Sequence, residues 1–402
     1  MLDTPNGRRW FFAVLYATEG APMGFIWWAL PTLLAREGVD VVAITTLSTA
    51  ATLPWVLKFL AGPVIDLSLL RGARLRTWIL CAQTAMVGSL AAVAWVDWPN
   101  QLALLTALLV GHAVCAATQD VAIDTLAIRV VPANELGRIN GWMQAGMLTG
   151  RAVVAAGTVI MTNRFGPAAP VIAVSVIIAL PMVLVWRSAP RASAAEVTIP
   201  PFKDWLGALT GRTAVLGIGI ALTAGAGFEF LAVVVGPLLV QDGVTDAQLS
   251  LFFGLLAPAG LAIGALYSGR LTDRLAPARG TALGIVGVAV LVGLLGALIS
   301  ADRSPSGLAL LAALACIYLA IGFLTAASYA LFMGLARGGL AATRFSIFMA
   351  MTNACEAWSG FSGGRLQAVV GYGPTLLLLV GISLLALPML KGVTMVRSAA
   401  PR

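Results

Sequence analysis

The stretch ATQDVAID (residues 117–124) places two carboxylates four residues apart inside an apolar run that extends from about residue 101 to residue 132. Asp120 and Asp124 share one face of a helix at this spacing, and Gln119 lies beside that face. A helix through this run is long enough to cross a bilayer, where an ionised group costs roughly a few kcal/mol or more unless it is paired, hydrated or protonated. The stretch therefore predicts a membrane-embedded acidic site, and a purely structural pair is the alternative.

The composition is typical of a multi-pass membrane protein. Of the 402 residues, 59% are hydrophobic and 10% are charged, whereas soluble domains carry about 25% charged residues. The basic residues fall in short loops rather than in one patch, which argues against nucleic-acid binding. The four cysteines lie in apolar runs without CxxC spacing, and His112 is the only histidine. We therefore expect neither a metal site nor a disulfide, and no cofactor.

Twelve apolar segments of about 20 residues or more predict an all-α integral membrane protein with twelve transmembrane helices in two pseudo-symmetric halves. The segments are 10–34, 41–65, 77–97, 101–130, 138–162, 167–187, 213–240, 247–270, 280–300, 307–333, 342–368 and 373–391. Residues 1–187 form the predicted N-terminal half, 188–212 a cytoplasmic linker, and 213–402 the C-terminal half. Asp66 aligns with Asp273 between the two halves. A repeat of six spans is typical of transporters that rock about a central site.

The distribution of basic residues predicts the orientation. Nineteen of the 25 lysines and arginines fall at the termini and in the loops on one side, four fall on the other side, and Lys58 and Arg151 lie inside spans. Because basic loops stay on the cytoplasmic side, both termini are predicted to be cytoplasmic. We expect no cleavable signal peptide, because the apolar run after Arg9 is too long for one.

Two loop sequences resemble a signature of the major facilitator superfamily. Gly62, Asp66, Arg71 and Arg74 match the loop between spans 2 and 3, and Gly269-Arg-Leu-Thr-Asp-Arg274 matches the loop between spans 8 and 9. The first copy departs from the pattern at Leu67-Ser68. The resemblance implies that family's fold and gating roles for Asp66, Arg71, Arg74, Asp273 and Arg274. Basic loops with a helix cap are the alternative interpretation.

A narrower resemblance covers most of the N-terminal half. EGAPMGF (19–25), LKFLAGPVID (57–66) and ATQDVAID (117–124) resemble AmpG-type permeases, a branch that includes the RhtX/FptX siderophore importers. Twelve spans are more similar to the siderophore branch than to the muropeptide permeases, which commonly carry two more. The resemblance implies a bacterial inner-membrane protein that imports a siderophore, with an anhydromuropeptide as the alternative substrate.

Further polar residues lie inside the predicted spans. Glu19 lies in a segment interrupted by glycines and a proline, where backbone groups can line a cavity. Arg151 cannot be neutralised and needs an anionic partner. The expected proton-coupling residues are Asp120, Asp124, Glu19 and Glu356, and the expected substrate-binding residues are Arg151, Gln119, Glu229, Asn353, Trp358 and Trp55. We expect Lys58 to pair with the aspartates, either as part of the gate or as a static counterion.

The sequence holds no GxxxxGK[ST] phosphate-binding loop, so ATP is not the expected energy source. We therefore predict a proton-coupled secondary transporter for an amphipathic, anionic small molecule, able to work as a monomer. Two other classes remain as alternatives. A membrane-embedded enzyme has little support because His112 is the only histidine, and we expect that side chain to be packed. A sensor that binds without translocating would be recognised by the absence of solute flux.

Overall fold

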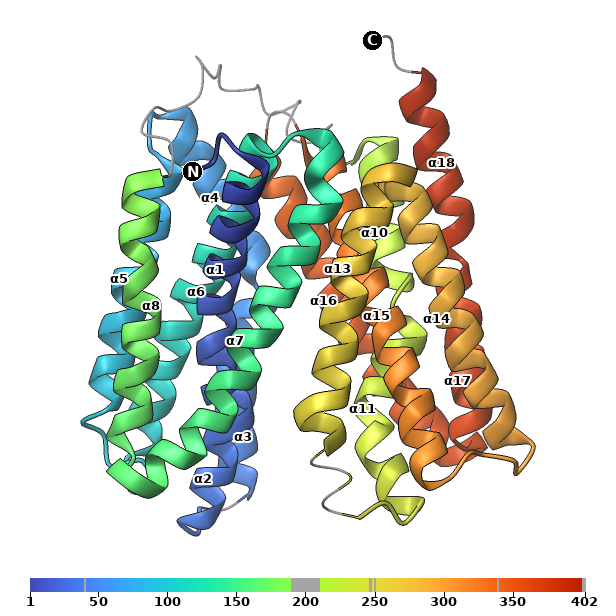
Figure 1. The fold of residues 1–402 in the computed structure, drawn as a ribbon, viewed down its shortest axis with the longest axis horizontal. Coiled ribbons are helices and arrows are strands. Elements are labelled where there is room, and N and C mark those ends of the chain that lie inside the picture. Colours follow the sequence, from blue (N-terminus) through green and yellow to red (C-terminus); the bar gives the residue numbers. More distant parts are fainter. Residues whose placement is uncertain (40, 189–209, 246–247, 249–250, 338–339, 400–402) are drawn as a thin grey trace. The chain divides into compact units, whose positions relative to one another are not determined.

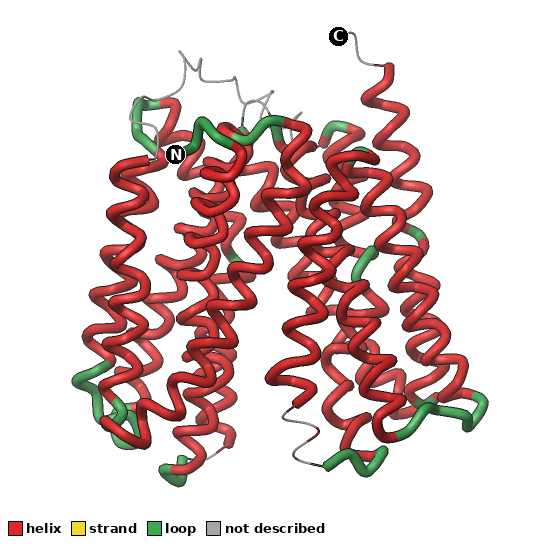
Figure 2. Tube along the Cα trace, in the orientation of Figure 1, coloured by secondary structure: helices red, strands yellow, loops and turns green. Residues whose placement is uncertain are grey.

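The computed structural model describes residues 1–402 except 40, 189–209, 246–247, 249–250, 338–339 and 400–402. Figure 2 shows helices and loops, and no strands, across the described residues. Within them, nine helices are long and apolar enough to cross a membrane. The three other predicted spans, 10–34, 77–97 and 342–368, are helical as well. The prediction of an all-α, multi-span fold is thereby confirmed. Most of the predicted linker lies outside the described residues.

The chain forms two compact units. The first contains Met1–Val131, Trp142–Pro200 and Arg337–Ser346, and the second contains Pro132–Gly141, Pro201–Ala336 and Ile347–Arg402. The helices α7 (Leu136–Phe165) and α16 (Ala341–Val370) each begin in one unit and continue in the other. The N-terminal turns of these two helices are therefore packed with the unit that does not hold the rest of the helix.

The first unit is built from helices that pack around α6. In order (Figure 1), they are α1 (Pro5–Met23), the π-helical η1 (Gly24–Ala29), α2 (Leu30–Arg36), α3 (Val41–Val56), the 3₁₀ turn η2 (Lys58–Leu60), α4 (Ala61–Leu70), α5 (Leu75–Val93), α6 (Leu102–Val130), most of α7, and α8 (Ala168–Ser188). The helix α5 packs against α6 and α8, and α3 packs against α6. Leu90, Leu109 and Ile178 belong to the apolar core that results.

Glycines bring α1 and α7 into backbone contact. A Cβ atom on Gly20 would lie 2.0 Å from the carbonyl oxygen of Met147, and one on Gly150 would lie 2.0 Å from that of Ala17. Small residues allow helices in membranes to approach this closely. The contacts fix the register of α1 against α7 at Glu19, which lies between Ala17 and Gly20.

The second predicted span is interrupted near its middle. The helix α3 ends at Val56, the 3₁₀ turn η2 follows, and α4 resumes at Ala61. Pro54 and Pro63 flank the interruption, and each lacks the N–H that a continuous helix requires. Lys58 begins the 3₁₀ turn and is 7% exposed. The interruption therefore positions a buried ammonium group inside the first unit.

The second unit repeats this style of packing. Besides the rest of α16, its helices are α10 (Arg212–Thr223), α11 (Ala226–Gln241), the π-helical η4 (Phe252–Leu256), α13 (Ala257–Leu275), α14 (Pro277–Ser300), α15 (Gly307–Ala336), α17 (Tyr372–Leu384) and α18 (Ala386–Ala399). The helix α13 lies along α15, and a Cβ on Gly264 would meet the carbonyl of Leu319 at 1.9 Å. Glycine thus allows the backbones of this helix pair to approach closely as well.

Candidate functional site

A buried ion pair joins the interruption in span 2 to the acidic helix α6. The Nζ atom of Lys58 lies 2.8 Å from Oδ2 of Asp120. The side chain of Lys58 is 7% exposed and that of Asp120 is 5% exposed. Isolated charges at such burial are very costly, and a close pair offsets much of that cost. The pairing of Lys58 with an aspartate of α6, which the sequence predicts, is confirmed.

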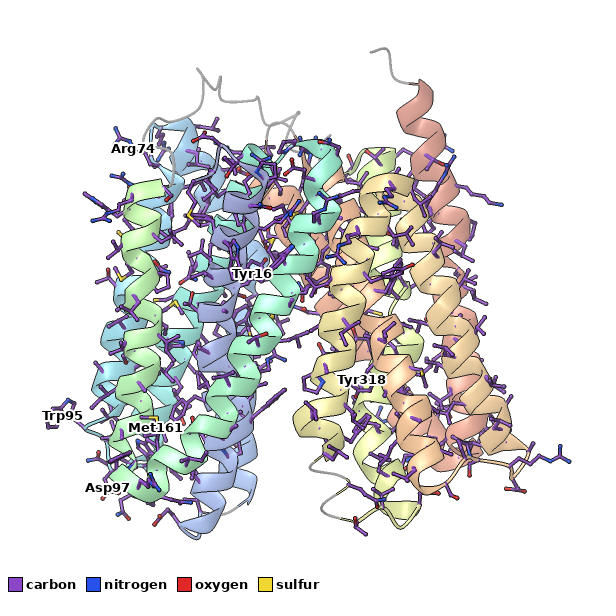
Figure 3. The ribbon with its side chains drawn as sticks, in the orientation of Figure 1. Tyr16, Arg74, Trp95, Asp97, Met161 and Tyr318 are labelled. Atoms are coloured by element: carbon purple, nitrogen blue, oxygen red, sulfur yellow. The ribbon has the colours of Figure 1, made fainter. Side chains whose placement is uncertain are left out.

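The second aspartate of α6 has a partner that the sequence did not reveal. The hydroxyl group of Tyr16 donates a hydrogen bond to Oδ1 of Asp124, and both residues are buried. Figure 3 labels Tyr16 among the helices of the first unit. Tyr16 precedes Glu19 by three residues on α1, so the two lie on one helical face. This spacing of three residues from Glu19 is the sequence signal that could have identified Tyr16 as part of the acidic site.

Glu19 completes the cluster from α1. Its side chain is 1% exposed, and no donor among the described residues reaches either carboxylate oxygen. The carboxyl groups of Asp120 and Asp124 are close enough to Glu19 to interact with it electrostatically. Like charges this close together repel one another strongly in a buried site.

The cluster is rich in acid relative to base. Glu19, Asp120 and Asp124 supply three carboxyl groups, and Lys58 supplies one ammonium group. Full ionisation would leave two excess negative charges in a buried site, which low local dielectric strongly disfavours. Gln119 is 1% exposed beside them, and its amide has no hydrogen-bond partner among the described residues. The geometry suits the uptake and release of protons and the binding of a polar solute.

Arg151 lies in the same unit, on the α7 face that α1 contacts. Its Nη2 atom lies 3.0 Å from Sδ of Met23, and its Cζ atom lies 5.5 Å from the ring centroid of Trp28. Thioether and aromatic groups both interact favourably with a guanidinium group. Trp55 is placed similarly, with its ring centroid 5.8 Å from Nζ of Lys58. Lys58 and Arg151 therefore each lie against an aromatic ring.

The predicted site residues of the C-terminal half lie in the second unit. Glu229 lines a cavity of about 50 Å³ together with Thr352, Cys355 and Tyr329, which is room for a few water molecules. Glu356 is exposed on α16. The proton-coupling role expected of it stays a prediction.

Two other predicted binding residues of this unit have local roles. The indole Nε1 of Trp358 donates to the backbone carbonyl of Leu222 at 3.0 Å. This bond fixes α16 to α10, so the indole N–H is engaged by the protein itself. Asn353 is half-buried, one turn before Trp358 on the same helix.

Asp66 caps the N-terminus of α16. Its Oδ2 accepts hydrogen bonds from the backbone N–H of Thr343 at 2.8 Å and from the Thr343 hydroxyl at 2.7 Å, and Oδ1 accepts from the N–H of Ala342 at 3.4 Å. The positive end of a helix stabilises a carboxylate placed there. Gly62, one turn earlier, approaches so closely that a Cβ would lie 2.8 Å from the Thr343 Cα.

Asp273 occupies the equivalent position in the second unit. Its Oδ1 accepts from the backbone N–H of Arg138 at 3.2 Å, near the start of α7, and its Oδ2 lies 3.4 Å from the guanidinium Nε of Arg138. Gly269, four residues earlier, is as close to Arg138 as Gly62 is to Thr343. The aligned aspartates thus perform the same capping. The remaining predicted gate residues, Arg71, Arg74 and Arg274, are exposed.

Comparison with known proteins agrees with this architecture. The family model of the Major Facilitator Superfamily matches residues 12–359. The human organic anion transporter MFSD10 superposes with a TM-score of 0.74 at 13% identity, covering 96% of this chain and 99% of that one. The fucose:proton symporter FucP of E. coli gives 0.74 at 14% identity, over 95% and 97% of the two chains.

One curated relative is similar in sequence over a shorter region. The anhydromuropeptide permease of Escherichia coli (strain K12) is 29% identical over 131 residues, which are 32% of this chain. The match spans about a quarter, 26%, of that permease. The resemblance to the siderophore branch gains no specific support from these comparisons. The match of the family model over most of the chain, together with the shared fold, shows that this protein belongs to the major facilitator superfamily.

Proposed function

We propose that this protein is a proton-coupled secondary transporter that imports an amphipathic, anionic solute by alternating access, with a siderophore as the first candidate. The observation that supports it best is the buried cluster of Glu19, Asp120 and Asp124 with Lys58. Three acids and one base in a buried space require bound protons, and buried ionisable groups inside a membrane protein are commonly functional. The predicted coupling role of Asp120, Asp124 and Glu19 rests on this charge imbalance.

The ion pair offers a direct route to coupling. Protonation of Asp120 removes the negative partner of Lys58, which lies 2.8 Å away. The ammonium group is then available to a carboxylate or phenolate of the solute, at the same place and with the same charge complementarity. Loss of the proton restores the internal pair and expels the anion. Solute and proton therefore bind together, as symport requires.

Arg151 and the aromatic rings supply the rest of the proposed binding surface. Arg151 beside Trp28 and Lys58 beside Trp55 each combine a cation with an aromatic face. An anionic solute with an apolar or aromatic body complements both features. Gln119 contributes a buried amide able to donate and accept. Within the second unit, Glu229, Asn353 and Trp358 are the proposed substrate-binding residues, and Glu356 is the proposed proton site.

The capping aspartates are the proposed latch of the gate. Asp66 holds the first turn of α16 and Asp273 holds the first turn of α7. Each cap is a small set of charge-assisted hydrogen bonds that can form and break during a transport cycle. The positive-inside distribution supports a cytoplasmic location for this end and for both termini. The resemblance to AmpG-type permeases supports a bacterial inner membrane. A single chain contains both aligned copies, so a monomer is sufficient.

An anhydromuropeptide is the second candidate substrate. The permease from Escherichia coli that matches 131 residues of this chain carries that substrate in its name. Muropeptides are anionic like siderophores but more hydrophilic, so the aromatic contacts of Arg151 and Lys58 would contribute less to their binding. Growth on one siderophore as the sole iron source, compared with β-lactamase induction by cell-wall fragments, distinguishes the two.

The direct experiment is uptake into proteoliposomes. Purified protein would be assayed with labelled siderophores and labelled muropeptides, with and without an imposed inward proton gradient. We expect one class to accumulate, and only when the gradient is present. Binding without flux would identify a sensor, and chemical conversion of the solute would identify an enzyme. Either of those results would refute the proposed function.

A further inference from the structure

An open groove runs along the outer side of the interruption in span 2. It has a volume of about 640 Å³ and is lined by α3, α4, α5 and α6, mainly by leucine, valine and alanine. Leu53, Leu57, Leu60 and Val64 are each about half exposed along it. Lys58 also lines it, with its ammonium group turned to Asp120. The groove is thus apolar and ends against the stem of a buried lysine.

A second, more polar hollow continues the groove toward the basic loop between α4 and α5. It has a volume of about 590 Å³ and is lined by Ser68, Gly72, Ala73, Arg74, Thr77, Trp78 and Cys81. Trp78 lines both hollows, and its indole N–H donates to the Ser68 hydroxyl at 2.7 Å. In Figure 3, Arg74 lies at the opposite end of the first unit from Trp95 and Asp97. The polar hollow therefore lies at a membrane–water interface.

The two hollows together match the shape and polarity of a phospholipid. We propose that they form a binding site for one anionic phospholipid, whose phosphate lies at Arg74 and Trp78 and whose acyl chain lies in the apolar groove. Lys58 and Arg71 are separated by about 20 Å at 1.5 Å per residue. That length is comparable with the half-thickness of a bilayer's hydrocarbon region, about 15 Å, plus part of the headgroup layer.

The charges select the headgroup. Arg74 is exposed at the hollow, Arg71 ends α4 nearby, and no acidic side chain lines either hollow. Each basic residue near the interface favours anionic lipid by about fivefold. Tryptophan also prefers the interface, where its apolar body and its N–H are both satisfied. A zwitterionic lipid would fill the groove without this electrostatic contribution to its affinity.

The bound acyl chain has a consequence for the ion pair. Leu57, Lys58 and Ala61 place the interrupted backbone of span 2 against the groove. A chain in the groove covers this backbone and the lysine stem from the side, and it keeps water from reaching Lys58 and Asp120 laterally. Backbone groups that leave the regular helix pattern within a bilayer must be covered or hydrated. The lipid would complete the low-dielectric wall of the site.

Native mass spectrometry of the purified full-length protein tests the site. The probes are phosphatidylglycerol, phosphatidylcholine and the water-soluble glycerophosphoglycerol headgroup. We expect the wild type to retain one phosphatidylglycerol in preference to phosphatidylcholine, and to bind the free headgroup far more weakly. Arg74→Ala should lower phosphatidylglycerol occupancy about fivefold, and Ala61→Trp should fill the groove and displace the acyl chain.

Two variants serve as matched controls. Arg279→Ala removes an exposed arginine near the start of α14, and Val290→Trp adds a tryptophan at an exposed position of α14. Both should retain the lipid as the wild type does. Equal retention of the two lipids, equal losses in Arg74→Ala and Arg279→Ala, or full retention in Ala61→Trp would each overturn the proposal. Binding of a second protein copy in place of the lipid, or tight binding of the headgroup alone, would also do so.

Discussion

The ammonium group of Lys58 lies 2.8 Å from the carboxylate of Asp120, although the two residues are 62 positions apart in the sequence. The pair is buried beside two further acids, and it joins the interrupted second span to the helix that carries both aspartates. Its formation and release connect protonation to solute binding in the proposed cycle.

Asp120→Asn should destabilise the protein by roughly 3–5 kcal/mol, because it leaves the buried ammonium of Lys58 without its charge partner. The double variant Lys58→Met with Asp120→Leu should regain most of that stability and still fail to accumulate solute. Thermal unfolding in detergent and proteoliposome uptake measure the two effects separately. Asp3→Asn is the control, because the Asp3 side chain is fully exposed. If the double variant accumulates solute like the wild type, the pair is a static counterion arrangement.

Asp124→Asn should abolish accumulation driven by a pH gradient while solute exchange across the membrane continues. An asparagine resembles a permanently protonated aspartate, so the carrier can still move with bound solute but cannot release the proton. Uptake and counterflow in the same proteoliposomes distinguish these outcomes. Undiminished, gradient-dependent accumulation in this variant would remove Asp124 from the coupling site.

Tyr16→Phe should alter the pH dependence of uptake without blocking it. The Tyr16 hydroxyl donates to Asp124, and a donor of this kind favours the ionised form of a carboxylate. Without this donor the ionised form of Asp124 is less favoured, so the alkaline limb of the uptake profile should move to higher pH. An unchanged profile would mean that Asp124 does not titrate during transport.

Gly20→Ala and Gly150→Ala should each destabilise the protein by about 1–3 kcal/mol, the usual cost of an overpacked interior. In both cases the added Cβ meets a backbone carbonyl at 2.0 Å, which cannot move aside as a side chain would. Gly157→Ala is the matched control on α7, where a Cβ finds nothing within 4 Å. That control should be neutral or slightly stabilising, because alanine favours helix over glycine. Equal melting temperatures for all three would show that α1 and α7 are not in close contact.

Asp66→Ala and Asp273→Ala should each cost about 0.5–2 kcal/mol as lost helix caps. They should also slow uptake while leaving equilibrium binding of the solute nearly unchanged, because the caps are proposed to act on the gate and not on the solute. Asp302→Asn is the control, since Asp302 is exposed and its positive φ of 53° suits asparagine as well as aspartate. A loss of binding affinity equal to the loss of rate would contradict the gating role.

Sequence patterns predicted the features that depend on local chemistry. The long apolar runs predicted helices because a bilayer requires internally satisfied backbone groups. The spacing of Asp120 and Asp124 predicted a shared face, and their need for a cation within the membrane made Lys58 the expected partner. The alignment of Asp66 with Asp273 predicted equivalent roles, and both residues cap a helix start.

Tertiary structure decided which groups meet. Tyr16 looked like an ordinary apolar residue of the first span until α1 was packed against α6, where its hydroxyl reaches Asp124. Glu356 is exposed on α16, which the sequence did not indicate, because helical periodicity alone does not say which face of α16 is covered by neighbours. Composition and periodicity thus determined that the chain is helical and membrane-embedded. The contacts at Asp124 depend on the close approach of distant helices, a relation that no local pattern in the sequence encodes.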